Sequence, residues 1–243
     1  RRWFEENHGT NANMIDPDGK VIPLGADVHR TAYRDFIVDL MVGVSRDYEV
    51  DGIHLDYIRT MGRCYCEKCR EEFAQQSGHS LAEATDEEWI GRQQLAIGNI
   101  VRRTAEGVRR VRPQAKISAA VFSNLQSGAA QGQDSPGWAN AGWIDVVMPM
   151  DYQMQSLRVR ANERQFLAAL DQTDKLVTGL SLYMRTDDGA VSRSPDLVAE
   201  QINLVRQMGI HGYCLFAYTY LDDAILTLLR DSVNAEPAVP AFR

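Results

Sequence analysis

The chain of 243 residues lacks several features that mark whole classes of protein. It has no apolar run near the ~20 residues of a membrane-spanning helix, so no transmembrane segment is predicted. Its 26 Lys and Arg are outnumbered by 33 Asp and Glu, and the formal net charge of -7 predicts no nucleic-acid partner. No glycine-rich phosphate loop follows a predicted strand, which argues against nucleotide binding.

Cysteine is scarce as well. Three of the four cysteines lie within six positions, a pattern that does not predict a disulfide framework. No apolar segment typical of a signal peptide follows Arg1. We therefore expect a secreted or periplasmic location if an upstream signal has been removed, and a cytoplasmic one otherwise. The sequence does not determine the oligomeric state.

Five short apolar runs alternate with helical patterns. Runs that are apolar throughout are typical of strands buried on both faces of a parallel sheet, and their alternation with helices indicates βα units. The expected strands are 50–57, 116–122, 144–150, 175–182 and 212–218, and the expected helices are 35–48, 86–111, 159–170, 194–208 and 222–231.

These runs predict an α/β fold, a parallel sheet of the (β/α)8-barrel type, with a doubly wound sheet as the competing architecture. Residues 1–235 are expected to form one domain, and 236–243 a linker or tail. The N-terminal 30 residues are expected to be mostly irregular, and 123–140 to be a long polar loop.

Polar side chains gather where the predicted strands end, which is where parallel barrels carry their active sites. Asp56 ends the first strand and Asp151 follows the third. Two carboxyls across a pocket are what glycosidic bond cleavage requires, and aromatic faces suit sugar rings. We therefore predict Asp56 and Asp151 as catalytic residues that face one pocket. The predicted substrate-binding residues are His54, Tyr57, Arg59, Trp138, Tyr152, Tyr183, Arg185 and Tyr218.

The surroundings of the two carboxyls suggest different protonation states. The apolar Met-Pro-Met segment before Asp151 is expected to raise its pKa by desolvation, as a general acid needs. Arg59 or Arg185 is expected to hold Asp56 ionised, as a nucleophile needs.

Each of these residues also has an ordinary structural interpretation. Asp56 could cap a helix, and Asp151 could pair with an arginine. His54 alternates with Asp56 and so points to the same side, either into a pocket or into the barrel core. The aromatic residues, taken singly, are more often packing residues. Asp222 and Asp223 are expected to cap the final helix.

Residues 48–59, Tyr-Glu-Val-Asp-Gly-Ile-His-Leu-Asp-Tyr-Ile-Arg, resemble the central strand of the bacterial glycosyl hydrolase-like family 10 domain. Residues 143–150 and 209–213 resemble its later strands. The resemblance implies a barrel that acts on bacterial glycans such as peptidoglycan. It also implies about three strands upstream, so we expect this chain to carry the last five strands of a longer barrel.

The same resemblance implies roles for the two carboxyls. In retaining α-glycosidases of several families an aspartate nucleophile ends the fourth strand, which is the place of Asp56. The α-galactosidase-like group adds an aspartate acid on the sixth strand, which is the place of Asp151. The chitinase pattern DGxDxDxE fits less well, because His54 and Ile58 replace two of its acidic residues.

The segment Cys64-Tyr65-Cys66-Glu67-Lys68-Cys69 is similar to one that helps to hold a structural zinc in family 42 β-galactosidases. Thiolates are preferred ligands of structural zinc, which takes four. The resemblance therefore implies a zinc site at Cys64, Cys66 and Cys69. The fourth ligand is a histidine, a carboxylate, or a residue upstream of this chain. Reduced, metal-free cysteines are the alternative.

Two functions follow from this reasoning. The first is a retaining glycoside hydrolase of a poly- or oligosaccharide, with Asp56 as nucleophile and Asp151 as general acid. The alternative is a carbohydrate-binding barrel without catalysis. A barrel enzyme of another kind, such as a deacetylase or lyase, is a weaker third. The distinguishing feature is whether the two carboxyls face each other across a pocket.

Overall fold

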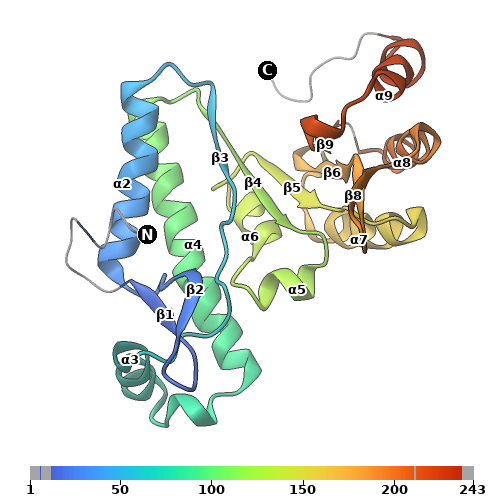
Figure 1. Cartoon of the computed structure of the whole chain (residues 1–243). Helices are drawn as coiled ribbons and strands as arrows, with labels where there is room; N and C mark the ends of the chain where they lie inside the picture. Colours follow the sequence, from blue (N-terminus) through green and yellow to red (C-terminus); the bar gives the residue numbers. More distant parts are fainter. Residues whose placement is uncertain (1–5, 7–11, 211, 237–243) are drawn as a thin grey trace.

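The structure is a computed structural model that describes Glu6, residues 12–210 and residues 212–236. Residues 237–243 of the predicted linker or tail lie outside the described residues, as does His211. Five parallel strands form one sheet with the order β3-β4-β5-β6-β9 (Figure 1). This confirms the predicted number and direction of strands. Their bounds are β3 Gly52–Leu55, β4 Lys116–Phe122, β5 Val146–Met150, β6 Val177–Ser181 and β9 Gly212–Phe216.

Helices connect these strands and pack against one face of the sheet (Figure 1). Thr85 caps the start of the longest helix and forms a capping box with Glu88. This helix ends before Pro113, as predicted. Ser194 caps another ahead of Pro195, and Asp222 caps the last, as expected. Their bounds are α2 Thr31–Asp47, α4 Asp86–Val111, α7 Ser156–Ala169, α8 Pro195–Gln207 and α9 Asp223–Leu228. No described helix is long and apolar enough to cross a membrane.

Several short elements differ from the sequence prediction. Between Ala12 and Arg30, β1 Asn13–Ile15 and β2 Val21–Ala26 form an antiparallel hairpin that was not predicted. The predicted long loop instead contains two short helices that Asn124 and Asp134 cap, α5 Leu125–Ala129 and α6 Ser135–Asn140. Helix α3, Glu67–Ser77, and the hairpin of β7 Tyr183–Thr186 and β8 Gly189–Ser192 were not predicted.

The register of the strands gives the sheet two distinct faces. Paired residues of parallel strands point to the same side. His54 pairs with Ser118, Phe122 with Met150, and Ser181 with Phe216. The face that these residues share is called the open face below. The opposite face packs on the helices and carries fully buried residues such as Leu55, Ile117, Val147 and Leu180.

A second, smaller core lies beside one end of α4. There the β1–β2 hairpin and α3 gather around the start of the long helix (Figure 1). Its buried residues are Met14, Cys64, Cys66, Cys69, Phe73, Leu81 and Trp89. The cysteine segment is therefore the centre of a small core and not a solvent-exposed loop.

Candidate active face and cysteine cluster

Asp56 directly follows β3, at the carboxyl end of that strand. At the start of β3, Gly52 has no room for a side chain, because an added Cβ would lie 2.4 Å from the main-chain oxygen of Lys116. Glycine therefore lets β3 pair closely with β4. After the strand, the main-chain nitrogen of Tyr57 donates to Asp56 Oδ1 at 2.8 Å, and Tyr57 has φ +53. A non-glycine residue in this conformation is uncommon and is typical of functional sites. The turn leaves both side chains exposed.

Four aromatic side chains line the opposite part of the open face and are called the aromatic wall: Tyr152, Tyr183, Phe216 and Tyr220. Tyr152 stacks on Phe216 with ring centroids 5.3 Å apart and an interplanar angle of 7°. The ring of Tyr183 stacks on that of Tyr220 with centroids 4.7 Å apart, and its centroid lies 6.2 Å from that of Phe216. Phe216 is still 47% exposed, so the wall presents ring surface to solvent. Such apolar surface with polar edges suits a sugar ring.

Asp56 and the aromatic wall act on one another electrostatically. Burial, and then the charges of Cys214, Asp56 and Tyr183, raise the pKa of Tyr152 to about 12. Tyr152 therefore stays a neutral hydrogen-bonding group, and Asp56 lies near enough for its charge to matter. His54 also lies exposed on the open face, and its Nδ1 is 2.8 Å from the Ser118 hydroxyl.

Arg59 packs against aromatic rings and not against the carboxyl of Asp56. Its guanidinium lies between the rings of Tyr57 and Phe122, with centroids 4.9 and 4.8 Å away. Within the described part of the chain, no ion pair joins Asp56 to Arg59 or Arg185. Arg59 instead supports the turn by packing against aromatic faces.

Asp151 does not face Asp56 across a pocket, which corrects the predicted pair. The carboxyl of Asp151 is fully buried, and its Oδ1 accepts a hydrogen bond from Asn162 of α7 at 3.0 Å. Alternation along β5 explains this orientation, since Met150 points to the open face and the next residue points to the helices. Burial does raise the pKa of Asp151 to about 6, the expected direction. However, a carboxyl packed against α7 cannot reach a glycosidic oxygen on the open face.

Trp138 is also not the sugar-binding residue that we predicted. It belongs to α6 and not to a loop, it is 1% exposed, and it packs in the main core. Tyr218 lies just after β9 and is 85% exposed, as a sugar contact needs. Arg185 lines a cleft of about 540 Å³ between the β7–β8 hairpin and the end of β9, together with Tyr183, Asp187, Phe216 and Tyr220.

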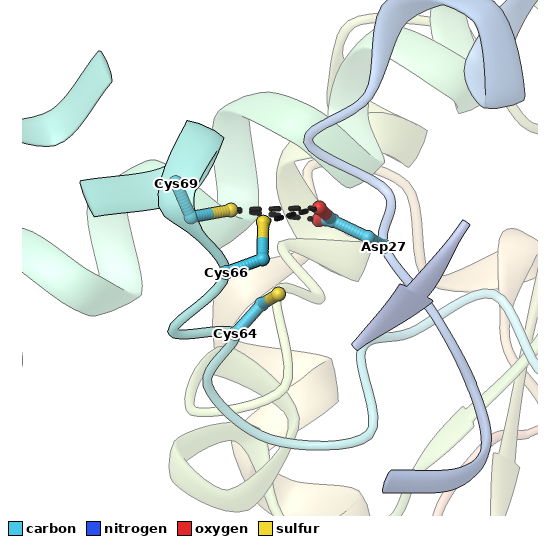
Figure 2. A group of neighbouring side chains, drawn as sticks. All are labelled: Asp27, Cys64, Cys66 and Cys69. Carbon is cyan, nitrogen blue, oxygen red and sulfur yellow. Dashed lines mark hydrogen bonds between the residues drawn. The ribbon is translucent and has the colours of Figure 1, made fainter. Parts of the chain in front are cut away.

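The three predicted metal ligands come together with one further residue. Asp27, just after β2, lies with Cys64, Cys66 and Cys69 so that their ligand atoms are all within 4.8 Å of one another (Figure 2). Cys66 Sγ and Cys69 Sγ each lie 3.5 Å from Asp27 Oδ2. All four residues are buried, and the cysteines are free thiols. These four side chains could hold a metal ion, and Asp27 is a carboxylate of the kind that the sequence analysis allowed as a fourth ligand.

The cluster is electrostatically unusual because acidic groups crowd into a buried site. Burial, and then the adjacent Cys66, raise the pKa of Asp27 to about 6. Hydrogen bonds with Cys64 and Cys69 lower the pKa of the Cys66 thiol. The hydrogen bond with Cys66 raises the pKa of the Cys64 thiol to about 11. The Arg30 guanidinium approaches Asp27 at 3.5 Å and Cys66 at 3.8 Å. Such a cluster favours a cation at its centre.

The sequence reasoning missed Asp27, Phe216, Glu163 and Arg193. Asp27 is 37 residues from Cys64 and matches no spacing rule. Phe216 lay within the predicted strand 212–218 and gave no polar signal. Glu163 and Arg193, both fully buried, stood in segments that read as ordinary surface.

Comparison with known proteins supports the fold. The family model described as glycosyl hydrolase-like 10 matches residues 24–192. The chain is similar to the PgaB (BpsB) glycoside hydrolase domain of Bordetella bronchiseptica, with TM-score 0.67, 13% identity and coverage of 94% of this chain and 70% of that one. A chitinase from Chromobacterium violaceum gives TM-score 0.60 and 14% identity over 90% of this chain and 78% of that one.

A β-galactosidase from Bacillus circulans is similar over 89% of this chain but only 38% of its own, with TM-score 0.68 and 11% identity. At these identities the solved structures show the barrel fold alone. No curated protein sequence matches the chain.

Proposed function

Because the chain belongs to the glycosyl hydrolase-like 10 family, we propose that it binds and cleaves a glycan on the open face of its sheet. The observation that carries the proposal is the exposed Asp56 at the carboxyl end of β3, on the same face as the aromatic wall. The wall would hold sugar rings by stacking, while Asp56 meets the reacting sugar. This is the arrangement of a barrel enzyme, whose functional groups end its strands.

In this proposal Asp56 attacks the anomeric carbon, or stabilises its positive charge, as the nucleophile of a retaining glycosidase does. Asp56 is exposed, so its carboxyl group is accessible to a glycan on the open face. Asp151 is not proposed as the acid, because it faces α7. Asp187 is the carboxyl to test in that role, because it lines the cleft that Tyr183 and Phe216 share.

The separation of Asp56 from Asp151 is the one observation that favours a second function, glycan binding without cleavage. Retaining enzymes place their two carboxyls about 5–5.5 Å apart, and here the expected pair lies on opposite faces. The two functions share the aromatic wall and differ only in turnover.

A panel of bacterial glycans separates the two functions. Peptidoglycan strands and chitooligosaccharides would be incubated with the chain, and both binding and new reducing ends would be measured. The proposal predicts binding and cleavage of at least one member. Binding without new reducing ends would support the non-catalytic function, and no binding to any member would contradict both.

We also propose that Asp27, Cys64, Cys66 and Cys69 hold one structural zinc ion. Four ligands with thiolates among them are the usual set for structural zinc. Ligands about 2.3 Å from a tetrahedral zinc lie about 3.8 Å from one another, close to the 3.5 Å from Cys66 Sγ and Cys69 Sγ to Asp27 Oδ2. Zinc would supply no chemistry to glycan cleavage here. It would tie the segment after Asp56 to the β1–β2 hairpin.

A further inference from the structure

Arg193 is a buried arginine that follows β8 and is only 3% exposed. Its guanidinium is used almost entirely on main-chain oxygens. Nη2 donates to Tyr152 at 2.6 Å, Nη1 donates to Gln153 at 3.0 Å, and Nε donates to Tyr183 at 3.0 Å. One side chain therefore fastens the residues that follow β5 to the first residue of β7.

Two of the three carbonyls belong to members of the aromatic wall. Tyr152 and Tyr183 each contact Phe216, but they come from segments 31 positions apart in the sequence. No described strand pairing joins β5 to β7. The relative position of the two rings therefore depends on side-chain contacts, among which Arg193 makes the most direct link.

A helix supports this link from behind. Gln201 of α8 accepts from Arg193 Nη1 at 3.1 Å and donates from its own Nε2 to Gln153 at 2.8 Å. Both polar ends of Gln201 are thus used, and the residue is 1% exposed. A buried network in which each donor and acceptor is satisfied holds its members rigidly.

The buried charge of Arg193 also needs compensation. Burial lowers the pKa of Arg193, and the charge of Asp151 acts in the opposite direction. No ion pair within 4.0 Å joins Arg193 to Asp151 among the described residues, so the oxygens of Tyr152, Gln153, Tyr183 and Gln201 are what hold the guanidinium.

We infer that Arg193 is a positioning residue that sets the spacing of Tyr152 and Tyr183 in the glycan site. The inference rests on the proposed function, since it assigns the aromatic wall to glycan binding. Lysine cannot replace Arg193, because a point ammonium group lacks the planar fork that reaches three carbonyls at once. Arg193→Lys keeps the charge and removes the fork.

The test compares Arg193→Lys with Arg109→Lys in protein with ¹³C-labelled tyrosine rings. Arg109 is a matched control because it also donates to a main-chain oxygen, that of Gly142 at 2.6 Å, but its partners are distant from the wall residues in the fold. We expect the Tyr152 and Tyr183 ring signals to shift in Arg193→Lys and to stay in place in Arg109→Lys. If Arg193→Lys does not fold, Gln201→Ala, which leaves the arginine in place, should give the same shifts in smaller size.

Affinity is measured on the same variants with the tightest glycan of the panel. We expect Arg193→Lys to bind at least tenfold more weakly than wild type, and Arg109→Lys to bind as wild type does. Unchanged tyrosine signals, or shifted signals with unchanged affinity, would overturn the inference. If wild type binds no glycan, the proposed function fails, while the tyrosine signals still decide whether Arg193 positions the two rings.

Discussion

Glu163 shows how a single buried residue sets a pH dependence. It lies fully buried on the face of α7 that meets the sheet, next to Asn162, the partner of Asp151. Burial, and then the charge of Asp151, raise the pKa of Glu163 to about 8 from the usual 4.5. The folded protein therefore favours the protonated form of this side chain. The contribution of Glu163 to the stability of the folded protein is fully present below pH 4.5 and is lost as the pH rises through 8.

Glu163→Gln should remove this dependence, because glutamine has the shape of the protonated acid. We expect the variant to match wild type in free energy of unfolding at pH 4 and to exceed it at pH 9, since a tenfold change in proton affinity corresponds to about 1.4 kcal/mol. Urea denaturation at both pH values measures the difference. Glu200→Gln, an exposed change on α8, is the control. Equal stability of Glu163→Gln and wild type at pH 9 would contradict the claim that burial raises the pKa of Glu163.

Trp138 and Tyr218 are aromatic residues with opposite surroundings, although the sequence suggested one role for both. Trp138 is 1% exposed and Tyr218 is 85% exposed. Trp138→Ala should cost about 3–5 kcal/mol of stability, as large core truncations do. Tyr218→Ala should leave stability nearly unchanged and weaken glycan binding. Thermal unfolding and glycan titration of both variants check this, and a stable Trp138→Ala with lost binding would reverse the assignment.

At the scale of elements, the sequence predicted what depends on periodicity and capping. Helix α4 lies where its helical pattern and Pro113 placed it, and the five parallel strands are those that the apolar runs indicated. The sequence could not show α3, because its buried residues pack only against the cysteine core. The β7–β8 hairpin is half-exposed and polar, so it has no apolar run to reveal it.

The predicted site residues followed the same division. Asp56 could be placed at a strand end because alternation fixes its face from Leu55 onward. The same alternation directs the side chain of Asp151 to the helices. The sequence alone does not show where the strand ends, and therefore does not show whether Asp151 still follows its alternation. Asp27 could not be predicted, since its contact with the cysteines depends on how the β1–β2 hairpin packs on α3.

The cysteine core also makes a testable prediction about metal. Protein purified without added metal should contain about one zinc per chain, because four buried ligand atoms converge there. Asp27→Ala and Cys66→Ser should lower that content and the unfolding temperature, since structural zinc contributes directly to folding. Cys214→Ser, which changes the exposed cysteine outside the cluster, should change neither. Elemental analysis is the measurement, and zinc-free protein with freely titratable thiols would contradict the site.

At the scale of the whole molecule, the sheet divides the protein into a structural side and a functional side. The helix face holds the main core and the buried polar side chains of Asp151, Glu163 and Arg193. The open face holds Asp56, His54 and the aromatic wall. The proposed glycan chemistry would therefore depend on exposed groups of the open face, and the proposed positioning groups lie behind it.

The turnover of Asp56→Asn on a glycan that wild type cleaves tests this account most directly. Asparagine keeps the size of the side chain and its hydrogen bond to Tyr57 but cannot act as a nucleophile. We expect turnover to fall by about 10³-fold or more, with wild-type binding and unfolding temperature. Asp51→Asn, at the exposed start of the same strand, should keep wild-type turnover. Wild-type turnover by Asp56→Asn would contradict the assignment of the open face as the active site.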